Sequence, residues 1–334
     1  MNQKTFLSSA SRYFNTGVLH RSDKLCAIFK ADWPLRKNAA EIKSGFDLLE
    51  TTTNPAPFES YNIEKYSGSN ITANRISAYL KEHLATDLLC AVAHGSIATD
   101  EQISYSDFDG LVIIRNEVFS NEARIKHVAE HLSKSYSLMI QGDPLQHHGW
   151  FVLTEKDISN WPAYYFPPVV FNYSKSLLND TLQLKIQNNV SAGDSKTSLT
   201  RMAATINKTL LKHNFPDNAY QLKSLLSEFM LLPTLFMQAM TGQGIYKKQS
   251  FTEAKNHIDP EVWKVMDKIS EIRSSWDINS GIVLPENPVL VTPVIKRKQI
   301  SNSKLVPDYL QSKLTDQLRQ EMLKFTRFVV TKIQ

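Results

Sequence analysis

The sequence predicts an α/β domain followed by a mainly α-helical region, in a chain of 334 residues. Between about residues 60 and 160, short apolar runs alternate with segments whose apolar residues recur at helical spacing. Beyond about residue 197, apolar residues recur at three- and four-residue steps, which is typical of helices. Because one domain usually takes about 100–200 residues, the length also favours two domains.

The α/β domain is expected to contain a mixed sheet flanked by helices. Its first clear element is an amphipathic helix in which Ile76, Leu80 and Leu84 follow helical spacing. Short apolar runs indicate buried strands, and strands that alternate with helices are typical of α/β folds. The expected elements are a helix over 71–86, strands over 88–93 and 111–114, a helix that includes 118–132, and a strand over 149–153.

The helical region is expected to hold long helices with one interruption. Its apolar-periodic segments cover 197–213, 218–241, 260–276 and 305–333. Pro233 should kink or break the second of these near Leu232, because proline lacks the backbone N–H and clashes with the preceding turn. The chain is thus divided into an N-terminal helical or irregular segment that packs on the core (1–60), the α/β domain (61–175) and the helical domain (176–334).

Composition excludes several broad classes of protein. Hydrophobic residues make up 42% of the chain and charged residues 21%, which is a globular balance rather than a disordered one. No apolar stretch approaches the roughly 18–20 residues that span a bilayer, and residues 1–15 lack the apolar core of a secretory signal. Cys26 and Cys90 have no C-x-x-C partner and are expected to be reduced thiols. We therefore expect a soluble, cytoplasmic protein.

The positive charge of the chain gathers near the C-terminus. The whole chain carries a formal charge of +5, whereas residues 290–334 hold nine Lys or Arg against three acids, a local sum of +6. Such a stretch could attract an anionic partner, such as a nucleotide or RNA. A solvated helix face is the more ordinary explanation, and we favour it.

One segment carries the clearest sign of chemistry. A predicted strand ends at Gly95-Ser96, ten residues follow, and Asp107-Phe108-Asp109 opens the next strand. Because strand side chains alternate, the two aspartates should project to one face and Phe108 to the other. Two carboxylates this close repel each other unless a cation lies between them, and oxygen ligands favour Mg²⁺.

The Gly95-Ser96 pair is suited to phosphate. Glycine lets a ligand approach the backbone closely, and Ser96 could offer its N–H and hydroxyl to a phosphate at the start of a helix. Taken alone, such a pair, or an Asp-x-Asp at a strand end, is most often a solvated loop. Two strands and a ten-residue gap make the combination far more specific. The P-loop, G-x-G-x-x-G, G-x-S-x-G and H-E-x-x-H motifs of other enzyme classes are absent from the sequence.

This pattern resembles the nucleotidyltransferase signature of the polymerase β-like superfamily, over about residues 70–155. By that resemblance Gly95 and Ser96 form the phosphate-binding pair, and Asp107 and Asp109 are the metal-binding carboxylates. It implies a nucleotidyltransferase fold with one or two Mg²⁺ ions. It also implies transfer of a nucleoside monophosphate from an NTP, for which we favour ATP, with release of pyrophosphate.

The resemblance leaves the third active-site position open. The family usually has a third carboxylate on a later strand, but the matching segment here, 146–153, contains no acid. Asp143 and Glu155 flank this segment and could reach the site. His147 or His148 could instead act as a base at neutral pH, although a histidine held in the core by hydrogen bonds is an equally good explanation. We take His148 as the third residue.

The helical half shows a second, shorter resemblance. The segment 241–254 is similar to part of the helical domain of aminoglycoside nucleotidyltransferases, in which a helix ends in a glycine-bearing turn followed by a lysine and a new helix. By this likeness Lys247 or Lys248 would contact the triphosphate, and the helical domain would bind the substrate. A solvated lysine pair beside a turn is the alternative.

The predicted function is therefore Mg²⁺-dependent transfer of a nucleoside monophosphate from an NTP to a hydroxylated acceptor in the cleft between the domains. Asp107, Asp109 and His148 are the expected catalytic residues. We favour a small-molecule acceptor over RNA or protein, and we expect no membrane partner. The alternative is a catalytically degenerate nucleotide-binding or regulatory module of the same fold, because the third acid is missing. The sequence determines neither the acceptor nor the oligomeric state.

Overall fold

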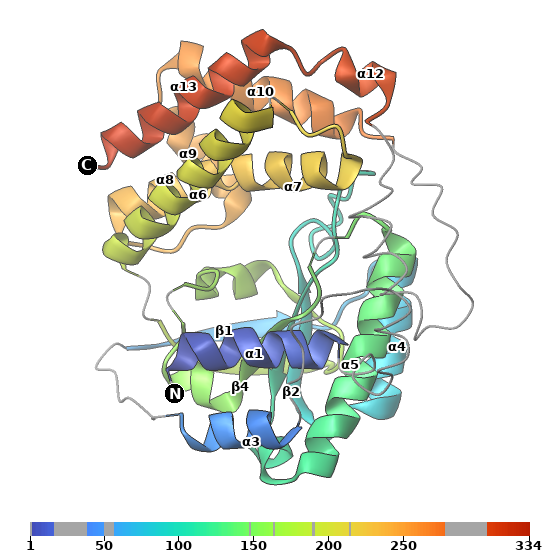
Figure 1. The fold of residues 1–334 in the computed structure, drawn as a ribbon. Coiled ribbons are helices and arrows are strands. Elements are labelled where there is room, and N and C mark those ends of the chain that lie inside the picture. The colour runs from blue at the N-terminus through green and yellow to red at the C-terminus, as the bar shows by residue number, and fades with distance from the viewer. Residues whose placement is uncertain are drawn as a thin grey trace.

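The protein consists of a sheet-containing part and a helical part. The structure is a computed structural model that describes residues 2–16, 39–49, 57–146, 148–162, 164–188, 191–213, 215–277 and 306–334. In Figure 1 the strands and the N-terminal helices lie below, and the helices from residue 192 onward lie above them. The expected order, a mixed sheet flanked by helices and then a mostly helical region, is confirmed. Cys26 and His147 lie outside the described residues.

The main sheet has four strands in the order β4-β3-β2-β5. β2 and β3 are antiparallel, β4 runs parallel to β3, and the short β5 is antiparallel to β2, so the sheet is mixed. The strands are β2 (Leu88–His94), β3 (Asp109–Ile114), β4 (Phe151–Thr154) and β5 (Lys175–Ser176). Because β3 and β4 are parallel, their first residues lie at the same edge of the sheet.

A second sheet pairs two strands that lie far apart in the sequence. β1 (Phe58–Glu64) and β6 (Thr181–Gln187) are antiparallel over their whole length. Neither strand is among the expected elements, although in β6 Leu182, Leu184 and Ile186 alternate with polar residues, as in a half-buried strand. β6 lies beyond the boundary expected at residue 175, yet Leu184 and Ile186 belong to the same core as the main sheet. The domain boundary itself stays a prediction.

Four helices flank the main sheet and pack on one another: α1 (Gln3–Thr16), α3 (Ala39–Asp47), α4 (Ile71–His83) and α5 (Glu122–Gly142). α4 begins after Asn70, whose side chain accepts a hydrogen bond from the backbone N–H of Ala73 at 2.8 Å. Asn121 caps α5 in a similar way. Val118 therefore belongs to a separate 3₁₀ helix, η2 (Asn116–Ser120), and not to α5 as expected.

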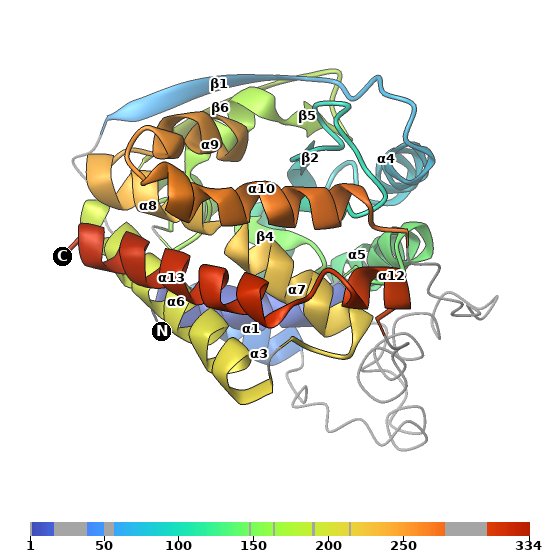
Figure 2. The same cartoon turned by 90° about the horizontal axis from the view of Figure 1, so that it is seen from above.

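The described helical part contains helices of 4 to 22 residues. They are α6 (Ala192–His213), α7 (Ala219–Phe229), α8 (Leu232–Thr241), α9 (Lys247–Lys255), α10 (Pro260–Ser274), α12 (Asp308–Gln311) and α13 (Asp316–Lys332). The predicted break near Pro233 is confirmed, since α7 and α8 are separate. The helix expected over 305–333 is also divided, because Thr315 caps a new helix, α13. α13 packs against both α6 and α10 (Figure 2). None of the described helices is long and apolar enough to cross a bilayer.

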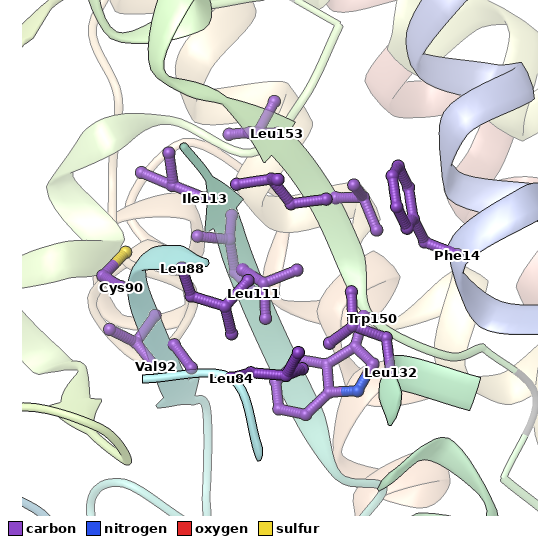
Figure 3. Close-up of a cluster of buried hydrophobic side chains, with 14 of the residues drawn as sticks. Phe14, Leu84, Leu88, Cys90, Val92, Leu111, Ile113, Leu132, Trp150 and Leu153 are labelled. Carbon is purple, nitrogen blue, oxygen red and sulfur yellow. The ribbon is translucent and has the colours of Figure 1, made fainter. Parts of the chain in front are cut away.

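The buried side chains form two hydrophobic cores. Figure 3 shows the first, in which side chains of β2, β3 and β4 meet Phe14 of α1 and Leu132 of α5. Burying each large apolar side chain of this kind stabilises the fold by about 1.5–3 kcal/mol. Cys90 is a buried free thiol in this core. The second core lies among the helices, but it also includes Tyr105 and Leu145 of the α/β part, so the two parts share a packed contact.

Three histidines gather where α4 and α5 pack together. The ring of His131 lies 4.4 Å from that of His83 and 4.5 Å from that of His127, between centroids, and its Nδ1 lies 2.8 Å from the hydroxyl of Tyr79. Burial, followed by the positive charge of its neighbours, lowers the pKa of His131 to about 4. An unfolded histidine titrates near pH 6.5, so the unfolded chain binds more protons between these two values. The contribution of neutral His131 to stability is therefore lost as the pH falls through this window.

We predict that His131→Gln reduces the loss of stability on acidification. The full pKa shift corresponds to about 3 kcal/mol, but screening at this partly exposed position lowers the expected effect to about 1 kcal/mol. Chemical denaturation at pH 7 and at pH 4.5 measures it, with His257→Gln, at an exposed position beyond α9, as the control. An equal pH dependence in the two variants would contradict the prediction.

Candidate active site

A cavity of about 1140 Å³ lies between the α/β part and the helical part. Its walls come from the turn after β2 and the start of β3 on one side, and from α6 to α10 on the other. All of the site residues predicted from the sequence line it: Gly95, Ser96, Asp107, Asp109, His148, Lys247 and Lys248. The structure thus brings the two motif segments, which lie in different halves of the chain, to one cavity.

Gly95 and Asp109 are in close contact at the edge of the main sheet. Asp109 pairs with His94 across β2 and β3, so Gly95 begins the turn directly beside the carboxylate. The φ angle of Gly95 is +68°, a conformation that side chains disfavour. A Cβ atom at this position would lie 2.6 Å from Oδ2 of Asp109. The glycine is therefore required both by the backbone conformation and by the close approach of Asp109.

Ser96 does not open a helix, contrary to the expectation from the sequence. Residues 95–100 form consecutive turns, in which the N–H of Glu101 donates to the carbonyl oxygen of Ser96 at 2.9 Å. The hydroxyl of Thr99 donates to the carbonyl oxygen of Gly95 at 3.3 Å. Ser96 still lines the cavity, but without the added field of a helix N-terminus.

Gln146 holds the backbone between the two aspartates. Its Oε1 accepts a hydrogen bond from the N–H of Phe108, and its Nε2 donates to the carbonyl oxygen of Phe108, both at 2.9 Å. Gln146 is fully buried, and the ring of Phe108 packs edge-on against Trp150. As expected from strand alternation, Phe108 faces the core while Asp107 and Asp109 face the cavity.

Asp107 is bound to a buried lysine of the helical part. Nζ of Lys223, on α7, lies 2.6 Å from Oδ1 of Asp107 and 2.5 Å from Oδ2 of Asp143. The side chain of Lys223 is only 1% exposed. Burial acts to lower the pKa of Lys223, but Asp143 and Asp107 outweigh it and raise the pKa, so the lysine is charged.

Asp109 is bound to His148. Nε2 of His148 lies 3.1 Å from Oδ1 of Asp109, and its Nδ1 lies 3.3 Å from the carbonyl oxygen of Gly149. Acceptors beside both ring nitrogens favour the ring form in which both nitrogens carry a proton. Burial acts to lower the pKa of His148, but Asp109 outweighs it and raises the pKa. In the same way His148 overcomes burial and holds the pKa of Asp109 well below its usual value. This arrangement favours a charged His148 that holds Asp109, rather than a base that waits for a proton.

The structure separates the candidates for the third position. His148 contacts Asp109 directly, and Asp143, the residue after α5, reaches Asp107 through Lys223. Glu155 does not reach the site, because it follows β4 at the far edge of the sheet and accepts a hydrogen bond from the N–H of Asn116 at 2.8 Å. His147 lies outside the described residues.

The two predicted lysines differ in their surroundings. α8 is followed by a glycine-bearing turn and then by α9, as the second resemblance implies, and Lys247 is the first residue of α9. Burial, then the charge of Arg273, lowers the pKa of Lys247 to about 8, although Asp109 and Asp107 act in the opposite direction. Lys248 is 70% exposed and forms an ion pair with Glu101.

Packing against the α/β part fixes the start of α9. A Cβ atom at Gly244 would lie 2.5 Å from Cβ of Pro167, so only glycine allows this approach. The ring of Tyr246 stacks on that of Tyr173, with 3.9 Å between centroids. These two contacts place Lys247 at the cavity.

The two aspartates suit Mg²⁺ by the chemistry of their donors. Mg²⁺ is usually held by one or two carboxylates, with waters and substrate phosphates as its other ligands. Within the described ranges, no three His, Cys, Asp or Glu side chains form a group that could hold a metal ion. A pair of carboxylates beside the turn expected to bind phosphate therefore fits Mg²⁺ bound together with a nucleotide, and not a site made by the protein alone.

Three residues at the site are missing from the sequence prediction: Lys223, Arg273 and Gln146. Lys223 has a visible signal, because it lies among Ala219, Leu222 and Leu226 on the buried stripe of an amphipathic helix. A charged residue on such a stripe requires a buried partner. Arg273, whose guanidinium lies 4.5 Å from the ring centroid of Tyr105, has no comparable signal.

The sequence matches no protein-family model and no curated protein. Among solved structures, the chain resembles a spectinomycin adenyltransferase from Enterococcus faecialis, determined with ATP and spectinomycin. The TM-score is 0.34 and the sequence identity is 12%, over 73% of this chain and 98% of that chain. A likeness of this size carries no functional weight, so the function is inferred from the geometry of the site.

We predict that Gly95→Ala lowers the free energy of unfolding by about 1–2 kcal/mol and displaces Asp109, because alanine disfavours positive φ and its Cβ would collide with the carboxylate. Gly193→Ala is the matched control. The nearest atom to a Cβ at Gly193 is 3.9 Å away, so this change should not destabilise the protein. Urea denaturation of both variants measures the difference, and equal stabilities would contradict the prediction.

Proposed function

We propose that this protein is a nucleotidyltransferase that moves a nucleoside monophosphate from an NTP to a hydroxyl acceptor and releases pyrophosphate. The observation that carries the proposal is the convergence of Asp107, Asp109, the Gly95-Ser96 turn and Lys247 on one cavity. Each of these is a group that phosphoryl transfer needs: ligands for a metal ion, a turn that admits phosphate, and a cation.

The chain's own residues would contribute mainly position and charge. Mg²⁺, held by Asp107 and Asp109, would neutralise charge on the reacting phosphate when it is bound. Gly95 would let the triphosphate approach the backbone. Lys247 and Arg273 would face the negative charge that passes to the leaving pyrophosphate. His148 would act as a positioning residue that fixes the orientation of Asp109.

A small molecule is the acceptor that these features favour. Aromatic and aliphatic side chains, such as Phe166, Met202 and Leu235, line part of the cavity. Recognition of RNA would need unpaired basic residues at the surface. In the described part of the C-terminal stretch, Lys313 pairs with Glu271 at 3.1 Å and Arg319 pairs with Asp316 at 2.5 Å. Lys324, Arg327 and Lys332 on the same helix are exposed, so the charge of this stretch is only partly paired, and the preference for a small molecule rests on the apolar lining of the cavity.

A nucleotide-binding module without catalysis is the second candidate. It is favoured by one observation, that a histidine and not an acid contacts Asp109. Such a module would bind an NTP with Mg²⁺ but would release no pyrophosphate with any acceptor.

We predict that Asp109→Asn reduces pyrophosphate release at least about a hundredfold, because an amide neither neutralises a metal ion nor holds His148. A pyrophosphate-release assay with each NTP and a panel of hydroxylated small molecules measures this, with circular dichroism as the check on folding. Asp100→Asn, an exposed change in the turn after β2, should leave turnover unchanged. Nucleotide binding without release in the wild type would favour the second candidate. Full activity in Asp109→Asn would overturn the assignment.

We predict that nucleotide affinity depends on the charge of Lys247. Because the pKa of Lys247 is about 8, the free protein loses this charge above pH 8, and affinity for a non-hydrolysable NTP should fall as the pH rises from 7 to 9. Lys247→Met should weaken binding about tenfold at pH 7 and remove this pH dependence. Lys248→Met, which changes an exposed lysine already paired with Glu101, is the control. Isothermal titration at pH 7 and 9 gives both quantities, and equal behaviour of the two variants would exclude the role of Lys247.

A further inference from the structure

Lys223 occupies a place that nothing in the proposed function explains. Its ammonium lies between Asp107 and Asp143, at 2.6 Å and 2.5 Å, and its side chain is 1% exposed. A buried ammonium is costly unless it is fully paired, and removing one partner of such a pair leaves an uncompensated charge. The carboxylates and the lysine are therefore mutually dependent.

The lysine is fixed in this position by its own helix. The hydroxyl of Tyr105 donates to the carbonyl oxygen of Lys223 and also lies 2.8 Å from the hydroxyl of Ser227, one turn further along α7. Tyr105 is itself buried in the helical core, only two residues before Asp107. Moving the ammonium into water would break its ion pairs with Asp107 and Asp143 and its contact with the ring of Tyr105, whose centroid lies 5.4 Å from Nζ. Lys223 should therefore stay on Asp107 when a nucleotide binds.

The position of the lysine suggests what it does. Two carboxylates this close repel each other unless a cation lies between them, and a divalent ion can serve as that cation. Here the ammonium of Lys223 already lies between Asp107 and Asp143, at 2.6 Å and 2.5 Å. A divalent ion between these two carboxylates would compete with Lys223 for Asp107.

We propose that Lys223 is a built-in cation that takes the place of one of two divalent ions, so that a nucleotide binds here with a single Mg²⁺. The claim that a nucleotide binds with a single Mg²⁺ rests on the proposed function. The claim that Lys223 replaces a divalent ion between Asp107 and Asp143 does not, because it concerns only these three side chains.

The first experiment tests the carboxylates without a nucleotide. Lys223→Gln leaves Asp107 and Asp143 facing each other, and two close carboxylates attract a divalent ion. We expect Mn²⁺, followed by electron paramagnetic resonance, to bind Lys223→Gln about tenfold or more tightly than it binds the wild type, and to raise the melting temperature of this variant alone. Lys223→Arg keeps the charge and should behave as the wild type. The double variant Lys223→Gln/Asp143→Asn should lose this increase in Mn²⁺ affinity. No gain in Lys223→Gln would overturn the proposal.

The second experiment counts the ions that bind with the nucleotide. The wild type, titrated with Mn²⁺ in the presence of a non-hydrolysable NTP, should bind one ion per chain, and two ions would overturn the proposal. If Lys223→Gln fails to fold with and without Mn²⁺, the number of ions that the wild type binds with the nucleotide decides whether the proposal holds. Failure of the wild type to bind the NTP at all would instead refute the proposed function, and the first experiment would still test the lysine.

Discussion

The burial of one ammonium group constrains how the two parts of this protein meet. Lys223 lies on a helix of the second core, yet its charge is paired only by carboxylates of the α/β part among the described residues. Because the cost of an unpaired charge at this depth exceeds most single contributions to stability, α7 must sit where Asp107 and Asp143 can reach it. α7 packs against α6, and both helices contribute residues to the wall of the cavity between the two parts.

Asp107 and Asp109 are positioned by quite different means. Asp107 is held by its ion pair with Lys223 of the helical part. Asp109 is held by its place in the sheet and by His148, and the absence of a side chain at Gly95 leaves room for its carboxylate. Gln146 links the two by holding the backbone of Phe108 between them. A change in the contact between the two parts should therefore reach the site through Asp107, while Asp109 stays in place as long as the sheet is intact.

The sequence predicts what depends on local patterns and misses what depends on distant contacts. The main strands, the break at Pro233 and the opposite directions of Phe108 and its neighbouring aspartates all follow from periodicity or from one residue's geometry. β6 is missing from the prediction although it carries the alternating pattern of a strand, but its pairing with β1 across more than a hundred positions has no local signal. Glu155 looks suitable by its distance along the chain, but the parallel direction of β4 places it at the wrong edge. Arg273 reaches the cavity because of the position of α10 in the folded protein. The packing of one helix against distant elements cannot be predicted from a short segment of sequence.

The third position shows how a single substitution alters the electrostatics of the whole site. A carboxylate beside Asp109 would add a negative charge, whereas Asp109 overcomes the burial of His148 and raises its pKa toward the charged form. A protonated His148 favours the charged form of Asp109, which a carboxylate would oppose. Lys223 adds a further positive charge at the other carboxylate. A site that already contains two cations of its own has less need of metal ions to hold its acids together, and it gains most from an ion that arrives with the phosphates of its ligand.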